Sequence, residues 1–216
     1  MKRPEIRKEK VETLYDARFL KLYDLHYAEG KHYFDATRRN KEDIVAVMQD
    51  EEFKKMLPDA VTIAVVINLP KEEPKLLLQY EYRYPVGQFL LSPVAGLIDP
   101  EDRENDFEKA LFCAAKREIK EETGIDIKES DELKILNPCA FSSPGMTDES
   151  NAFLMAKVNL ENLDCLDQSG AVGSELFNGF ELLSKEEAAC LFKSGTDKYG
   201  NRFSLATWAV LAFFII

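Results

Sequence analysis

Residues 117–125 have the pattern of a helix end that carries three carboxylates. Glu118, Glu121 and Glu122 lie within this segment, and Gly124, a residue that commonly ends helices, follows them. At 100° per residue, Glu118 and Glu122 stack one turn apart with Glu121 beside them, a repulsion of about 0.2–0.5 kcal/mol. A shared cation would remove that repulsion, and oxygen ligands of this kind suit Mg²⁺ or Mn²⁺. The alternative interpretation is a solvated, charged helix face.

Length and net charge narrow the class of protein. With 216 residues, the chain can form one substantial domain with an added subdomain. Its formal net charge of −11 would repel a phosphate-coated partner, so we expect no binding to nucleic acid. A small anionic substrate is compatible with this charge, because divalent cations and nearby arginines reverse the sign of the field within one cleft.

Cysteine and histidine usage point to a cytoplasmic protein without a zinc centre. The four cysteines are spread singly, with no C-x-x-C pair, which favours reduced thiols over a disulfide framework. His26 and His32 are too few for a zinc site or a histidine-based triad. No signal-peptide pattern is visible, and the apolar run at residues 205–216 is too short to span a bilayer. We therefore expect no membrane association.

Residues 1–55 are expected to form a separate unit that is rich in strands. Residues 19–27 alternate as a strand does, residues 28–31 supply a turn, and residues 32–36 return as a second strand. A bare hairpin is unstable unless something covers it. The pattern of residues 44–48 predicts a further strand, followed by a short helix.

The remaining residues, 56–216, alternate strands with helices. One helix is expected to begin at Asn105, where Glu108 has capping-box spacing, and to end at Gly124. Another opens at Ser184. This alternation, which begins with antiparallel hairpins, predicts an α+β sandwich. Strands are expected at residues 61–69, 75–83, 89–92, 132–139, 152–158 and 177–183, and a last helix at residues 205–216.

The carboxylate segment resembles the core of the Nudix box, G-x5-E-x7-R-E-U-x-E-E-x-G-U, in which U is aliphatic. Gly96 matches the first glycine, but twenty residues separate it from Arg117 where the pattern has thirteen. The seven extra residues are expected in the polar, proline-led loop 100–106. Counted back from Arg117, the middle glutamate of the pattern falls on Lys109, with Glu108 one residue away, so this position is either unoccupied or shifted. The half of the motif that binds metal is intact.

Two flanking segments narrow the resemblance to the ADP-ribose and ADP-sugar diphosphatases of this family. Residues 80–87 are similar to the Q-Y-R-x-P-V-G segment of that branch, and residues 143–149 resemble its S-P-G-F-T-D-E loop. The resemblance implies a Nudix-type α/β/α sandwich with a mixed sheet over residues 56–216. It also implies that residues 1–55 are an N-terminal β subdomain used for homodimerisation. Ser92 stands where the branch has a glutamate, which leaves the exact substrate open.

The resemblance also implies roles for individual residues. Arg117 would orient a box glutamate through an ion pair. In this branch the base that activates water can lie outside the box, and Glu149 and Glu175 are both candidates. A divalent cation, Mg²⁺ with Mn²⁺ as the alternative, would bind the carbonyl of Ala95 and the carboxylates of Glu118, Glu121 and Glu122. Substrate would contact Arg83, Arg39, Gly96, Gly145 and Met146.

We therefore expect a cytoplasmic, homodimeric, Mg²⁺-dependent enzyme that cleaves ADP-ribose or a related ADP-sugar into AMP and a sugar phosphate. One alternative is a Nudix hydrolase of another nucleoside diphosphate derivative, such as a different nucleotide sugar or a dinucleotide. The other is a catalytically silent Nudix domain that senses nucleotides. Retention of Glu118, Glu121 and Glu122 argues against the silent domain.

Overall fold

The computed structural model describes residues 4–104, 106–171 and 173–216, and the chain divides into two compact units. Unit 1 comprises the residues up to Asp59 together with Cys139–Asn151. Unit 2 comprises Ala60–Pro138 and Ala152–Ile216. Residues 139–151, which the sequence had placed in the second domain, therefore belong with the N-terminal unit. No helix in the described ranges combines the length and apolar character needed to cross a membrane.

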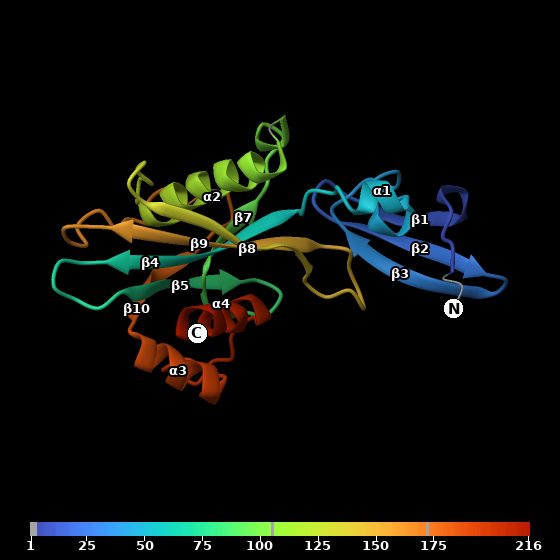
Figure 1. Cartoon of the computed structure of the whole chain (residues 1–216). Coiled ribbons are helices and arrows are strands. Elements are labelled where there is room, and N and C mark those ends of the chain that lie inside the picture. Colours follow the sequence, from blue (N-terminus) through green and yellow to red (C-terminus); the bar gives the residue numbers. More distant parts are fainter. Residues whose placement is uncertain (1–3, 105, 172) are drawn as a thin grey trace. The chain divides into compact units, whose positions relative to one another are not determined.

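Unit 1 is built on a three-stranded antiparallel sheet in the order β1-β2-β3, drawn in blue in Figure 1. Strands β2 (Lys21–Ala28) and β3 (Lys31–Thr37) form the expected hairpin, and Gly30 takes a positive φ of 64° in its turn. Strand β1 (Val11–Asp16) was not expected. Only its first residue is buried, so its sequence lacks the alternation of a half-buried strand.

The strand expected at residues 44–48 is wrong. Val45–Val47 form a 3₁₀ turn, η2, and α1 (Asp50–Phe53) follows it. A 3₁₀ turn places positions three apart on one side, and Ile44 and Val47 are both buried in the core of unit 1. A second 3₁₀ turn, η1 (Lys8–Lys10), precedes the sheet. The core that these turns cover consists of Val11, Tyr23, Leu25, Ile44 and Val47.

Unit 2 is a sheet with helices on both faces. The strand order is β10-β5-β4-β9-β8, with β6 added to β5 and β7 added to β4. Helix α2 lies on one face of the sheet, and α3 and α4 lie on the other (Figure 1). The strands are β4 (Ala60–Asn68), β5 (Lys75–Arg83), β6 (Gln88–Ser92), β7 (Val94–Leu97), β8 (Glu132–Phe141), β9 (Ser150–Asn159) and β10 (Phe177–Leu183). The helices are α2 (Phe107–Thr123), α3 (Lys185–Ser194) and α4 (Leu205–Ile215).

Helix α2 is held at both ends by local sequence. The expected start, Asn105, lies outside the described residues, and the N-cap is Asp106, whose side chain accepts a hydrogen bond from the Lys109 N–H. Gly124 ends the helix in the left-handed conformation, with a φ of 77°. The helix buries an apolar side made of Ala110, Leu111, Ala114, Ala115 and Ile119. These contacts seat the carboxylate-bearing turns of α2 against β7 and β4.

Candidate functional site

The carboxylates of α2 lie against Gly96 of β7. A β-carbon added at Gly96 would lie 1.9 Å from the carboxyl carbon of Glu118, so only glycine leaves room for this side chain. Glu118 and Glu122 are buried, with 5% and 2% of their surface exposed. Glu121 is partly exposed at the same end of the helix. The structure therefore places two of the three carboxylates in a desolvated position beside β7.

Glu122 is held by donors from two strands of the sheet. Gln79 of β5 donates from Nε2 to Glu122 Oε2 at 2.5 Å, and the Ala95 N–H of β7 donates to the same oxygen at 3.3 Å. Burial raises the pKa of Glu122 well above its ordinary value, and the charges of Glu81 and Glu118 raise it further. Glu81 therefore belongs to the same cluster of acids.

Glu118 shares this electrostatic environment. Burial raises its pKa to about 7, against the lowering effect of Arg117, and the charges of Glu121 and Glu175 add to the increase. The pKa of Glu81 is also raised by burial, with a further contribution from Glu175. Carboxylates that repel one another in a desolvated site are destabilised as anions, and a bound cation would offset that cost.

Arg117 links the helix to the loop that is extra relative to the box pattern. Its Nη1 donates to Glu118 Oε1 at 2.6 Å, and its Nη2 donates to the Leu97 carbonyl at 2.7 Å. The same Nη2 lies 3.2 Å from Asp102 Oδ2 and 3.3 Å from Asp99 Oδ2. Asp102 begins a 3₁₀ turn, η3 (Asp102–Glu104), and is itself buried. Asp102 of the loop and Asp99 just before it therefore supply acidic partners to the arginine.

The donor chemistry of this cluster fits a divalent cation. Its ligating groups are buried carboxylates, which are the oxygen donors that Mg²⁺ and Mn²⁺ prefer. In the described ranges, no three His, Cys, Asp or Glu side chains are arranged so that they could hold a metal ion as they stand. In this structure the Glu118 carboxylate accepts a hydrogen bond from Arg117, and the Glu122 carboxylate accepts one from Gln79. Arg117 and Gln79 thus restrain the orientation of these two carboxylates.

The other site residues predicted in unit 2 lie near the cluster. Arg83 forms an ion pair with Glu81 at 2.5 Å. Strand β10 pairs with β5 so that Phe177 lies opposite Glu81, which brings Glu175, just before β10, toward the acids. The predicted site residues that lie in unit 2 are Arg83, Ala95, Gly96, Arg117, Glu118, Glu121, Glu122 and Glu175.

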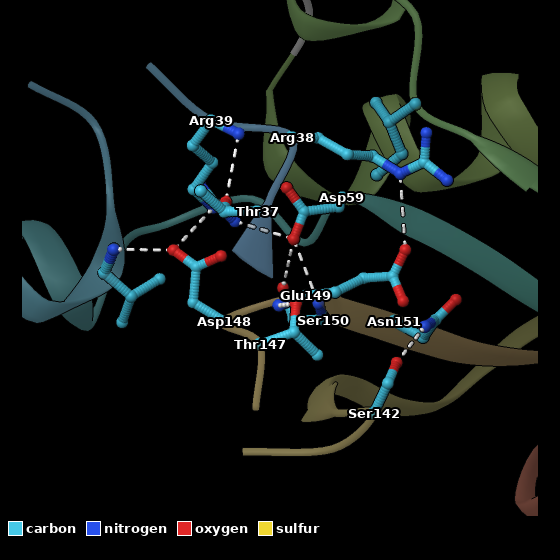
Figure 2. A network of polar contacts seen from close by, with 12 residues as sticks. Thr37, Arg38, Arg39, Asp59, Ser142, Thr147, Asp148, Glu149, Ser150 and Asn151 are labelled. Carbon is cyan, nitrogen blue, oxygen red and sulfur yellow. Dashed lines mark hydrogen bonds and ion pairs between the residues drawn. The ribbon is translucent and has the colours of Figure 1, made fainter. Parts of the chain in front are cut away.

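The remaining predicted site residues, Arg39, Gly145, Met146 and Glu149, belong to unit 1. Arg39 is largely buried, and its Nη2 donates to Asp59 Oδ2 at 2.9 Å (Figure 2). Glu149 pairs with Arg38 at 3.4 Å. The Gly145 carbonyl accepts from the Tyr33 hydroxyl at 2.9 Å, and the Met146 side chain is exposed.

Figure 2 shows how the polar network fixes residues 147–151 within unit 1. Asp59 Oδ2 accepts from the Ser150 N–H at 2.9 Å and from the Ser150 hydroxyl at 3.0 Å. Asp148 lies 3.6 Å from Arg39 and accepts from the Val45 N–H at 2.9 Å. The guanidinium of Arg39 therefore contacts two carboxylates of its own unit, those of Asp59 and Asp148.

Sequence reasoning missed Gln79, Glu81 and Asp102. The first two had a local signal: they are two residues apart in a strand, so both lie on one face, and they interrupt an otherwise apolar run. Asp102 had no comparable signal, because its contact with Arg117 depends on how the loop folds.

The chain resembles known proteins in sequence and in fold. No protein-family model matches the chain. An uncharacterized Nudix hydrolase of Schizosaccharomyces pombe (strain 972) is 28% identical over 102 residues, which are 47% of this chain and 44% of that protein. The chain thus matches less than half the length of this curated relative. A solved structure, described as that of an ADP compounds hydrolase, has a TM-score of 0.53 at 20% identity and covers 95% of this chain and 91% of its own. At that identity the likeness is one of fold.

Proposed function

We propose that this chain, a relative of the Nudix hydrolases with a Nudix-type α/β/α fold and an N-terminal β subdomain, hydrolyses nucleoside diphosphate derivatives. The proposed substrate is ADP-ribose or a related ADP-sugar, and the products are AMP and a sugar phosphate. The observation that carries the proposal is the pair of buried carboxylates, Glu118 and Glu122, packed beside Gly96.

The proposed mechanism assigns the residues of α2 to a cation. Glu118, Glu121 and Glu122, with the carbonyl of Ala95, would hold Mg²⁺ or Mn²⁺. Such an ion supplies positive charge for the diphosphate oxygens and makes the attacking water more acidic. Arg117 orients Glu118 through the 2.6 Å contact between them.

For the base that accepts a proton from water, we propose Glu175. Its charge raises the pKa of both Glu118 and Glu81, so it lies within electrostatic reach of the carboxylate cluster in the same unit. Glu149 belongs to unit 1 and pairs there with Arg38, and it is the second candidate. We propose that Arg83 contacts the substrate phosphate or ribose, because its ion pair with Glu81 holds it beside the cluster.

We also propose a cytoplasmic homodimer that associates through unit 1. We base this proposal on the large apolar side chains that are exposed on this small unit. All four cysteines are free, which agrees with a reducing compartment. Sedimentation equilibrium would test the dimer, since a monomer at micromolar concentration would contradict it. The exposed side chains include Leu14, Tyr15, Phe19, Leu20, Tyr33 and Phe34.

A different nucleoside diphosphate derivative is the alternative substrate. The observation in its favour is Ser92, which stands where the ADP-sugar branch has a glutamate. Ser92 is buried, and its hydroxyl donates to the Leu90 carbonyl at 3.2 Å, so it offers no charge to a substrate. This difference concerns the choice of substrate and leaves the carboxylates of α2 in place.

The experiment that tests the function is product analysis on a panel of nucleoside diphosphate compounds, with Mg²⁺ and with EDTA. We expect metal-dependent release of AMP and ribose 5-phosphate from ADP-ribose. The Glu122→Gln variant should lose this turnover, while the matched variant Glu108→Gln, at an exposed position of the same helix, should keep it. Turnover of another compound alone would support the alternative substrate, and inactivity with binding would support the nucleotide sensor.

A further inference from the structure

We propose that Gln168 is a positioning residue, which fixes how Glu122 is presented by way of Gln79. The inference deepens the proposed function and rests on it, because it concerns a carboxylate assigned to the cation. Gln168 lies in the loop before β10 and does not itself contact Glu122; its contact is with Gln79. Three hydrogen bonds in series connect the backbone of β10 to the helix.

The series begins at a backbone N–H. The Gly179 N–H donates to Gln168 Oε1 at 2.9 Å, and Gln168 Nε2 donates to Gln79 Oε1 at 3.2 Å. Gln79 Nε2 then donates to Glu122 Oε2 at 2.5 Å. Each glutamine thus uses its carbonyl toward β10 and its amino group toward the helix.

The direction of the series is fixed at its first bond. A side-chain amide can present either end, but a backbone N–H can only donate. Gln168 must therefore turn its oxygen to Gly179, which leaves its amino group for Gln79. The oxygen of Gln79 is then occupied, and its amino group is the end that reaches Glu122. A reversed Gln79 would set a carbonyl oxygen against a carboxylate at a fully buried position, where such repulsion is costly.

The loop that carries Gln168 is anchored on both sides of this residue. The Asp167 N–H donates to the Thr123 carbonyl at 3.0 Å, next to the end of α2. A β-carbon added at Gly170 would lie 2.3 Å from the carbonyl oxygen of Glu121, so the loop backbone packs directly on the helix there. Gln168 is therefore presented to Gln79 by a loop fitted to the carboxylate-bearing turns.

One carboxylate oxygen of Glu122 is occupied by hydrogen bonds from the protein itself. In the described part of the chain, both donors to this side chain, Gln79 Nε2 and the Ala95 N–H, bind Oε2. The second oxygen, Oε1, is left for a cation or its water. A reversed Gln79 would remove the stronger of these donors and disfavour the ionised carboxylate that a cation requires.

Two substitutions at position 168 separate this role from simple loop packing. Gln168→Glu keeps the size of the side chain and the bond from Gly179, but its second oxygen forces Gln79 to turn its amino group away from Glu122. Gln168→Met removes the hydrogen bonds and lets Gln79 keep its direction. If position 168 matters only for loop packing, Gln168→Glu should be milder than Gln168→Met. If the direction of the hydrogen bonds matters, Gln168→Glu should be the more damaging of the two. Ala171→Glu adds the same charge at an exposed position of the loop and is the control for charge.

The first readout is Mn²⁺ affinity, measured on the free protein by electron paramagnetic resonance. Changes to groups that orient metal ligands typically cost about 10–100-fold in affinity. We expect a loss in this range for Gln168→Glu, a smaller loss for Gln168→Met, and little change for Ala171→Glu. Equal losses in the two variants at position 168, or an equal loss in Ala171→Glu, would overturn the proposal.

The second readout is the urea midpoint without metal or substrate, in the wild-type and Glu122→Gln backgrounds, at an alkaline pH at which the Glu122 carboxyl group is ionised despite its raised pKa. Gln168→Glu should lower the midpoint more than Gln168→Met when Glu122 is present. The difference should disappear in the Glu122→Gln background, because the amide introduced there can rotate to pair with either end of Gln79. Persistence of the difference would overturn the proposal. Since neither readout uses substrate, an absence of diphosphatase activity would refute the proposed function and leave this test intact.

Discussion

Asp102 Oδ2 accepts a hydrogen bond from Arg117 Nη2 at 3.2 Å, so the seven-residue insertion contributes a buried carboxylate to the arginine that holds Glu118. The insertion is thereby part of the site and is more than a surface loop.

Replacing Asp102 should disturb both stability and turnover. We expect Asp102→Ala to lower the free energy of unfolding by about 1–3 kcal/mol, because a hydrogen-bonded partner of a charged group is lost from a largely buried position. Turnover should fall with it, since Arg117 loses one of its supports. Urea unfolding and initial rates would measure these effects. Asp126→Asn, which breaks the exposed Asp126–Lys120 pair, is the control and should change stability little. Equal effects of the two substitutions would contradict the role of Asp102.

Gly96 should not tolerate a side chain. The added methyl group of Gly96→Ala would overlap the Glu118 carboxyl group, which must then move away from Arg117. We expect metal-dependent turnover to fall at least about 100-fold, because small misplacements of catalytic groups have effects of this size. Circular dichroism would establish that the variant folds. A folded variant with wild-type turnover would show that this packing does not set the position of Glu118.

The two candidate bases can be distinguished by matched substitutions. We expect Glu175→Gln to reduce kcat by about 10²–10⁴-fold, the usual contribution of a general base, with little change in KM. Glu149→Gln should reduce turnover less, because in unit 1 its carboxylate pairs with Arg38. The ratio of the two kcat values is the measurement, and a larger loss for Glu149→Gln would reverse the assignment.

Asp35 makes stability depend on pH. Burial raises its pKa from 3.8 to about 6, and the charge of Asp148 adds to this increase. The folded state therefore binds the extra proton, and the stability that Asp35 contributes is complete below its unfolded pKa and is lost as the pH rises through about 6. We expect Asp35→Asn to raise the free energy of unfolding by about 1–3 kcal/mol well above that pH, and by much less near pH 4.

Urea unfolding of the Asp35→Asn variant across this range would test the prediction, with Asp43→Asn at an exposed position of the same unit as the control. The asparagine keeps an oxygen for the bond from the Asp148 N–H, so a loss of that contact would not mask the effect. A stabilisation that does not change with pH would mean that Asp35 does not titrate in the native state within this interval.

The sequence was most informative where structure and chemistry are local. The three carboxylates, the stop at Gly124 and the strand at residues 177–183 follow from spacing within a few residues, and the structure has the helix end and the strand where they were expected. The expected strand at residues 44–48 failed, because a short apolar run does not distinguish a strand from a 3₁₀ turn when burial decides between them.

The rest of the site depends on contacts between distant residues. Gln79 is 43 residues from Glu122, and Gln168 is 89 residues from Gln79, so no periodic pattern connects them. Their partnership arises only when β5, α2 and the loop before β10 pack together. Side-chain amides also lack an intrinsic direction, which only the surrounding donors and acceptors assign.

The assignment of residues 139–151 to unit 1 affects how the protein can be divided. The polypeptide passes from one unit to the other three times, after Asp59, after Pro138 and after Asn151. The N-terminal unit is therefore not a tail that a later start codon or a single proteolytic cut could remove. A version of unit 2 without it would need a new connection between β8 and β9, and gene truncation alone would leave residues 139–151 without their partners in unit 1.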